Sequence, residues 1–198
     1  MAPTRTTKIY HLGTDQNLQT VQAAPDLAQP FYVSHAADLS VACATLIFDV
    51  SRSTGPLLCG LGFPAEKPAA WGGFMARFPG VRACAHQAPP VVRAVQQATE
   101  GLLQGAPPPL KLTGTPFQHR VWQALLSIPE GASDTYGGLA AKLGSSPRAV
   151  GGAVGANQLA WLVPCHRILG ADGKLHGYRW GLAVKARLLA AERVSFSG

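Results

Sequence analysis

The sequence of 198 residues contains no long apolar run and little charge. Charged residues make up 14% of it and hydrophobic residues 47%, a balance typical of a folded globular chain. A membrane-spanning helix needs about 18 or more consecutive apolar residues, and none is present, so we expect no membrane partner. The beginning, "MAPTRTTKIYHLG", lacks the apolar segment of a secretory signal. We therefore expect a cytoplasmic protein.

Cysteine is scarce, and its spacing excludes the common metal motifs. The four cysteines stand at positions 43, 59, 84 and 165, and no two form a CxxC pair. Structural zinc sites usually have such pairs, so we expect no bound metal. The pattern also fits a reducing compartment better than a disulfide framework.

Positive charge is concentrated in the second half of the chain. Residues 106–198 hold ten Lys and Arg against four Asp and Glu, whereas residues 1–105 hold seven against six. A basic region favours an anionic partner, most often a nucleic acid. A merely basic surface would look the same.

The pattern along the chain predicts two parts, residues 1–105 and 106–198. The first 35 or so residues are weakly patterned and are expected to be partly irregular. Residues 39–63 predict two strands and a turn, and residues 89–105 predict a helix. The Pro- and Gly-rich stretch "GAPPPLKLTG" marks the boundary between the parts.

The second part predicts a series of short helices. Thr115 and Pro116 suit the N-cap and the first turn of a helix. A short helix in "YGGLAAKLG" closes at Gly144, and another starts at once with Ser146 as N-cap and Pro147 in its first turn. Two short helices joined by about three residues are typical of a helix-turn-helix, although ordinary helical hairpins look alike.

The second helix of this pair has an unusual composition. Arg148, Gly152 and Gly155 fall at positions i, i+4 and i+7 and so share one face. Each glycine inside a helix costs about 1 kcal/mol relative to alanine. The face suits either tight packing against another element or close approach to a nucleic-acid groove, with the arginine protruding.

The segment "WLVPCHRILG" places Cys165, His166 and Arg167 side by side. Adjacent side chains usually point apart, so a water molecule linking the thiol to the imidazole is more plausible than direct contact. Glu192, in the last helix, would then orient the imidazole and complete a relay. The alternative is an inert buried cysteine beside surface basic residues, with Glu192 paired to Arg187 or Arg193. That helix is expected to bury one apolar side, made of Leu182, Leu188, Leu189 and Val194.

Several motifs together resemble one known family. "GTPFQHRVWQALLSIPEG", "RAVGGAVGAN" and "VPCHRILGADGKLHGY" are similar to motifs of the O6-alkylguanine-DNA alkyltransferases, also called methylated-DNA–protein-cysteine methyltransferases. The likeness runs from about residue 114 to residue 192, and "GYRWG" is similar to the bacterial adaptive-response protein. The zinc-binding regulatory domain of that protein is not apparent here. The resemblance implies an α+β fold: a small N-terminal α/β lobe with an RNase H-like sheet, and a mostly helical C-terminal lobe with a winged-helix-like helix-turn-helix.

The resemblance also implies an activity. Members transfer the alkyl group from O6 of guanine in double-stranded DNA to their own cysteine, here Cys165, after flipping the nucleotide out through the minor groove. Activity on O4-alkylthymine, a single turnover, no cofactor and a monomeric state are further expectations. His166 would be the water-linked base and Glu192 its partner. Asn157 would brace the active-site turn, and Tyr136 would donate a proton to the leaving guanine.

The remaining expected contacts follow from the same motifs. Arg148 matches the finger that fills the gap left by the flipped nucleotide, with Ala149, Gly152 and Ala153 beside it against DNA. The expected substrate pocket comprises Val163, Pro164, Tyr178, Arg179 and Trp180.

Three departures from the family pattern bear on the pocket. The turn "GSSPRAVGG" is shorter than in many members, and Trp161 replaces a usual aliphatic residue, expected to pack in the core. Arg179 and Trp180 stand where many members have smaller residues, and they could change which alkyl groups fit. Three other functions remain open: an alkyltransferase-like lesion binder, against which the intact cysteine argues; a regulatory activator; and an unrelated thiol hydrolase or redox protein.

Overall fold

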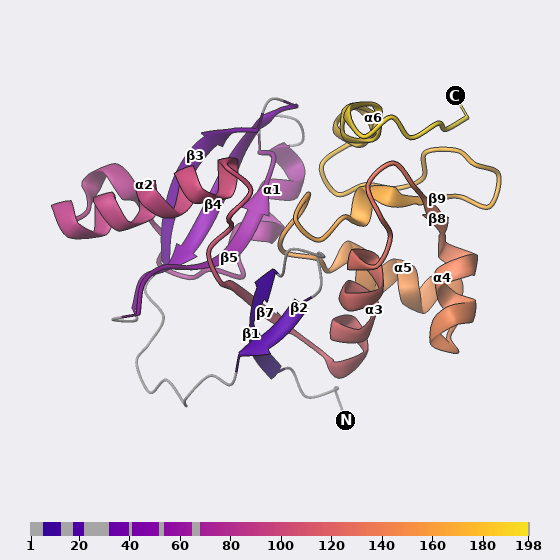
Figure 1. The fold of residues 1–198 in the computed structure, drawn as a ribbon, viewed down its shortest axis with the longest axis horizontal. Coiled ribbons are helices and arrows are strands. Elements are labelled where there is room, and N and C mark those ends of the chain that lie inside the picture. The colour runs from indigo at the N-terminus through magenta and orange to yellow at the C-terminus, as the bar shows by residue number, and fades with distance from the viewer. Residues whose placement is uncertain are drawn as a thin grey trace.

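The computed structural model describes residues 6–12, 18–21, 32–39, 41–51, 54–64 and 68–197. Within these ranges, seven strands form one mixed sheet, which lies beside a group of helices from the second half of the chain (Figure 1). The strands follow one another across the sheet in the order β2 (Leu18–Val21), β1 (Thr6–Leu12), β7 (Leu110–Gly114), β5 (Leu57–Gly62), β4 (Cys43–Asp49), β3 (Tyr32–Asp38) and β6 (Arg82–Ala83).

The predicted strand pair and helix of the first part are confirmed. Strands β4 and β5 are antiparallel neighbours, and helix α2 spans Pro89–Leu103. The short elements between β5 and α2 were not predicted: helix α1 (Pro68–Met75), strand β6 and the 3-10 turn η1 (Cys84–His86). Strands β1 and β2 lie in the segment expected to be partly irregular; the rest of that segment, apart from the start of β3, lies outside the described residues.

Strand β7 continues the sheet beyond the predicted boundary at residue 106. It pairs antiparallel with β1 and parallel with β5. Its side chains alternate between buried and half-buried positions, as expected for a strand with one face against the core. The sheet therefore takes one strand from the part of the chain that also carries the helices.

Helices α3 and α5 begin at the predicted N-caps, and α4 ends at the predicted C-cap. In α3 (Pro116–Leu126) the side chains of Thr115 and Gln118 cap each other's backbone N–H groups, which satisfies two otherwise unpaired donors. Helix α4 (Tyr136–Leu143) ends at Gly144, whose φ of 59° is left-handed. Three residues later α5 (Pro147–Gly155) starts, as predicted, behind the Ser146 side chain, which accepts from the N–H of Ala149.

The remaining elements are short. They are β8 (Asp134–Thr135), the 3-10 turn η2 (Cys165–Arg167), β9 (Ile168–Leu169) and the last helix, α6 (Leu182–Ala191). Strands β8 and β9 pair in parallel. The α+β class is confirmed, while the RNase H-like sheet and the winged helix stay predictions. No helix in the described residues is long and apolar enough to cross a membrane.

The sheet and the helices share one hydrophobic core. Trp180, which is 1% exposed, has its ring centroid 5.1 Å from that of Phe74 and 6.4 Å from that of Phe63. A Cβ on Gly62 would come within 2.2 Å of the same indole, so β5 needs glycine at this position. The predicted burial of Leu182 is wrong: this first residue of α6 is 46% exposed.

Candidate active site

A tight turn after α5 holds the thiol of Cys165, and Asn157 braces it. The side-chain amide of Asn157 donates to the carbonyl of Val163 at 2.8 Å and to the sulfur of Cys165 at 3.2 Å. Its oxygen accepts from the N–H of Leu159 at 3.0 Å. Buried amide groups need such partners, and here they fix both ends of the turn. The structure therefore places Asn157 at the turn that it was predicted to brace.

Strand β5 holds the same turn from the sheet side. The N–H of Leu61 donates to the carbonyl of Gln158 at 2.8 Å, and the N–H of Ala160 donates to the carbonyl of Leu61 at 3.2 Å. Arg77, just after α1, donates to the carbonyl of Ala156 at 2.8 Å. The N-terminal lobe therefore contributes directly to the position of the thiol.

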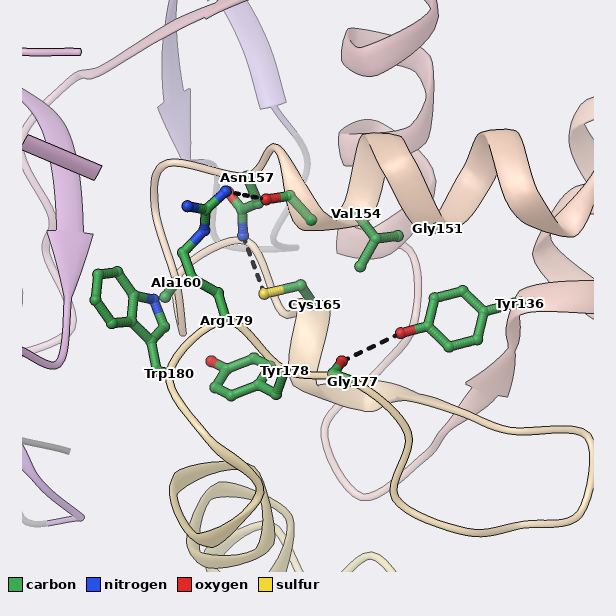
Figure 2. Close-up of a pocket in the computed structure, with 11 residues that line it drawn as sticks. Tyr136, Gly151, Val154, Asn157, Ala160, Cys165, Gly177, Tyr178, Arg179 and Trp180 are labelled. Carbon is green, nitrogen blue, oxygen red and sulfur yellow. Dashed lines mark hydrogen bonds between the residues drawn. The ribbon is translucent and has the colours of Figure 1, made fainter. Parts of the chain in front are cut away.

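The thiol lines a small cavity between α4, α5 and the segment that precedes α6 (Figure 2). Its volume is about 60 Å³, enough for a few water molecules at about 10 to 15 Å³ each. The predicted pocket residues Val163 and Pro164 do not line it; both are buried behind the turn. The lining residues are Tyr136, Gly151, Val154, Gly155, Asn157, Ala160, Cys165, Gly177, Tyr178, Arg179 and Trp180.

Burial and hydrogen bonding act on the thiol in opposite directions. Burial raises the pKa of Cys165, because a thiolate loses hydration. The hydrogen bond from Asn157 and the positive charge of Lys185 lower it. Burial, together with the nearby thiolate, also raises the pKa of Tyr136, so this hydroxyl stays a proton donor at neutral pH. It lies 3.4 Å from the carbonyl oxygen of Gly177.

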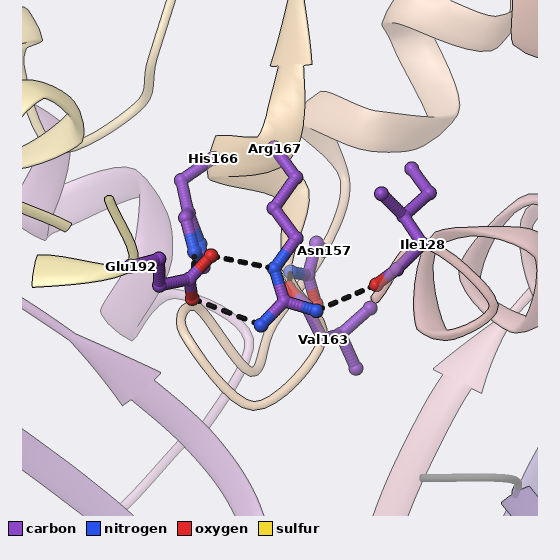
Figure 3. Close-up of polar contacts among 6 residues, drawn as sticks. All are labelled: Ile128, Asn157, Val163, His166, Arg167 and Glu192. Atoms are coloured by element: carbon purple, nitrogen blue, oxygen red, sulfur yellow. Dashed lines mark hydrogen bonds and ion pairs between the residues drawn. The ribbon is translucent and has the colours of Figure 1, made fainter. Parts of the chain in front are cut away.

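His166 and Arg167 share the carboxylate of Glu192 (Figure 3). Nε2 of His166 lies 2.9 Å from Oε1 of Glu192. Arg167 donates to both oxygens of Glu192, at 2.8 and 2.9 Å, and to the carbonyl of Ile128 at 2.6 Å. The pairing of Glu192 with His166 is as predicted. The Arg167 contact was not predicted.

The carboxylate of Glu192 fixes the tautomer of His166. Burial raises the pKa of Glu192, but its hydrogen bonds to His166 and Arg167 outweigh burial and hold the value at about 2. Burial lowers the pKa of His166 despite that partner, so the ring is neutral at pH 7. A carboxylate can only accept, so Nε2 carries the proton. Nδ1 is then an acceptor; it is buried, with no hydrogen-bond partner among the described residues.

Lys185 is a second buried cation that sequence reasoning missed. It is 0% exposed, and its Nζ donates to the carbonyls of Ile168 at 2.6 Å and His176 at 2.8 Å. Burial lowers its pKa to about 8, against the opposing pull of the Cys165 thiolate. The sequence could have predicted this burial. Leu188 and Leu189 follow Lys185 at i+3 and i+4, so the three residues lie on one face of the helix.

Helix α5 presents small residues and one arginine to solvent. Arg148, Ala149 and Gly152 are exposed, as a DNA-contacting face requires. The prediction for Ala153 is wrong, because this residue is 3% exposed and its carbonyl accepts from Nε1 of Trp122 at 2.9 Å. Trp161 is half-buried against the core with a φ of 72° and does not line the cavity. No metal-binding group of three or more His, Cys, Asp or Glu occurs in the described ranges.

The fold and the site together define an α+β protein with a hydrogen-bonded thiol beside the α4–α5 helix pair. Residues 116–194 match the family described as "6-O-methylguanine DNA methyltransferase, DNA binding domain". The chain is also similar to the solved structure of Mycobacterium tuberculosis OGT in complex with DNA. That likeness has a TM-score of 0.58 and 32% identity, over 82% of this chain and 92% of the other. The chain therefore belongs to the O6-methylguanine-DNA methyltransferase family.

The curated relatives match less than half of the chain. The "Regulatory protein ada" of Salmonella typhimurium is 52% identical over 86 residues, which are 42% of this chain and 24% of that protein. The "Methylated-DNA--protein-cysteine methyltransferase" of Candida albicans is 49% identical over 83 residues, 42% of this chain and 47% of the other. The chain thus spans less than half the length of these relatives.

Proposed function

We propose that this protein repairs alkylated DNA by moving the alkyl group from O6 of guanine to its own Cys165. One observation carries this proposal: a cavity lined by a hydrogen-bonded thiol and a protonated tyrosine, with a neutral histidine next to the thiol in sequence. These are the parts that alkyl transfer needs, namely a nucleophile, its base and an acid for the leaving group. The names of the relatives and of the DNA-bound neighbour agree with it.

Double-stranded DNA is the proposed partner, and it approaches along α5. Alanine and glycine on the exposed face of this helix let a groove come close to the backbone. A flipped guanine would bring its alkylated O6 to the cavity that the thiol lines. Flipping costs a few kcal/mol. Arg148, exposed at the start of α5, would fill the gap in the minor groove.

The chemical step uses the tautomer fixed by Glu192. A water molecule between the thiol and Nδ1 of His166 carries the thiol proton to the imidazole. The sulfur then forms a bond to the alkyl carbon while the bond between that carbon and O6 breaks. The electron pair of the broken bond remains on the guanine, and Tyr136 supplies a proton to it. Asn157 holds the sulfur in place throughout.

The remaining features follow from that step. A thioether is a stable product, so each molecule acts once and needs no cofactor. O4-alkylthymine carries the same oxygen-bound alkyl group and is a further proposed substrate. We also propose that the protein acts as a monomer in the cytoplasm; its four cysteines, all within the described ranges, are free thiols, which fits a reducing compartment.

Replacing Arg148 by alanine should slow transfer from duplex DNA about tenfold or more, since support of the flipped state amounts to one to a few kcal/mol. Transfer from a free O6-alkylguanine base should change little, because no nucleotide must be flipped. Single-turnover rates on both substrates measure the difference. Arg93→Ala, which removes an exposed charge from α2, is the matched control. Equal slowing on both substrates would show that Arg148 does not fill the gap left by the flipped nucleotide.

The stoichiometry of repair tests the proposed function itself. A duplex with one O6-methylguanine is incubated in excess over the protein, and the restored guanine is counted. We expect restoration to stop at one guanine per protein molecule. Continued turnover would indicate an ordinary enzyme, and binding without any restoration would indicate a lesion binder.

A further inference from the structure

Arg179 brings a positive charge into the wall of the thiol cavity. Its Nη2 donates to the carbonyl of Gly155 at the end of α5, and the residue lines the cavity together with Cys165. Figure 2 shows Arg179 and Tyr136 on opposite sides of the thiol. If Tyr136 contacts the guanine ring, the Arg179 side of the cavity stays open. A larger alkyl group, attacked at the carbon bound to O6, can extend into that side.

The guanidinium has unused hydrogen-bonding capacity at this position. Its Nε is buried and has no hydrogen-bond partner in the part of the chain that the structure describes. A buried donor without a partner costs about 1 to 3 kcal/mol, more when it is charged. Such a group therefore favours a ligand that supplies an acceptor. Burial lowers the pKa of Arg179, but guanidinium groups remain charged in proteins.

The side chains beside Arg179 in the cavity wall carry no charge. Ala160, Trp180 and Val154 are apolar, and Asn157 already uses its amide on the turn and the thiol. Among the residues that line the cavity there is no carboxylate to neutralise Arg179. Arg179 is attracted electrostatically to the Cys165 sulfur when the thiol is ionised. An acceptor at the far end of an alkyl group would thus meet a cation and no competing anion except the thiolate.

We propose that Arg179 is a specificity-determining residue that favours O6-alkyl groups ending in an oxygen acceptor, above all a carboxylate, over apolar groups of similar size. The proposal rests on the alkyl transfer proposed above and names the substrate class of that site. Hydrogen bonds between a guanidinium and a carboxylate are roughly twice as strong as neutral ones. The cation would also offset the repulsion between the thiolate and the carboxylate as they approach.

The carboxymethyl group is the simplest such substituent. The thiol proton passes to His166, and the sulfur forms a bond to the methylene carbon of O6-carboxymethylguanine. The bond between that carbon and O6 breaks, its electron pair stays on the guanine, and the guanine takes a proton from Tyr136. The product is S-carboxymethylcysteine at position 165, and no oxidant, reductant or co-reactant is consumed.

The test compares three duplexes that differ only in the lesion: O6-methyl-, O6-carboxymethyl- and O6-propylguanine. Single-turnover rates are measured for the natural protein, Arg179→Gln and Arg179→Lys. For the natural protein we expect faster transfer of carboxymethyl than of propyl. In Arg179→Gln the ratio of these two rates should fall tenfold to a hundredfold, about the effect of one charge-assisted hydrogen bond. Arg179→Lys keeps the cation and should retain part of the preference.

A control variant and the pattern of the three rates separate the possible failures. Arg187→Gln removes an equal charge from α6 and should leave the ratio unchanged. If Arg179→Gln slows all three lesions equally, the arginine acts on DNA as a whole and the specificity proposal is overturned. A natural protein that transfers methyl but prefers propyl to carboxymethyl overturns it as well. If the natural protein transfers none of the three, the proposed function fails instead.

Discussion

Replacing Cys165 by alanine should abolish alkyl transfer completely while DNA binding persists. Alanine has no atom that can bond to the alkyl carbon, so no rate should remain. The fold should tolerate the change, because the turn keeps the Asn157 bonds to the carbonyl of Val163 and the N–H of Leu159. Transfer is measured as restored guanine in a duplex, and binding by the mobility of the same duplex.

A second cysteine variant makes this result specific. Cys43 on β4 is an exposed free thiol, so Cys43→Ala removes the cysteine that solvent reaches most readily. This variant should transfer one alkyl group per molecule, like the natural protein. Residual stoichiometric transfer by Cys165→Ala, or its loss in Cys43→Ala, would contradict the assignment of the nucleophile.

Replacing Glu192 by glutamine should have the second-largest effect, on both rate and stability. The buried guanidinium of Arg167 would lose both ionic bonds to the carboxylate, and leaving a buried charge unpaired costs about 3 to 5 kcal/mol. His166 would lose the anion that fixes its tautomer, and general-base catalysis is worth about a hundredfold or more. Denaturant unfolding and single-turnover kinetics measure the two effects. Glu130→Gln, in an exposed loop, should change neither.

The same network predicts the pH dependence of stability. Glu192 titrates at about 2 in the folded protein against an ordinary 4.5, and the pKa of His166 also lies below its ordinary 6.5. Both groups therefore bind protons more readily when unfolded. The contribution of both groups to the free energy of unfolding is present in full above about pH 6.5. As the pH falls below 6.5, the contribution of His166 is lost first. The contribution of Glu192 is lost as the pH falls from about 4.5 towards 2. The loss below pH 4.5 should be smaller in Glu192→Gln. An equal loss would show that the carboxylate is not the titrating group.

Local signals explain why much of the site could be predicted from the sequence. Thr115, Ser146 and Gly144 act on backbone groups within a few residues of themselves, so caps and helix ends are readable from the chain. The relationship of Cys165 to Asn157 spans only eight residues and one turn. The other site residues, including the distant Glu192, were predicted from the motifs of the family.

Contacts between distant segments explain what could not be predicted. Strand β1 pairs with β7, some 100 or more residues away along the chain, and β2 pairs with β1. The sequences of both strands carry weak patterns. From the sequence alone Arg167 is assigned to the surface, because its partner Glu192 lies 25 residues away, at the end of α6. Ala153 has the same residue type as exposed Ala149, and only the position of Trp122 shows which of the two is buried.

The N-terminal lobe has a role that sequence alone gave little reason to expect. Strand β5 bonds to residues on both sides of Leu159, and an aromatic cluster made by Phe63, Trp71 and Phe74 encloses Trp180. Trp180 is next to Arg179 in the cavity wall. This lobe therefore supports the pocket through main-chain bonds on one side and aromatic packing on the other.

The mass of the peptide that carries Cys165 tests the central claim most directly. The protein is mixed with a duplex containing one O6-methylguanine, digested, and compared with protein mixed with unmodified duplex. We expect this peptide to gain the mass of one methylene group, with no gain at Cys43, Cys59 or Cys84. A restored guanine with an unchanged Cys165 peptide, or a gain on another cysteine, would contradict it.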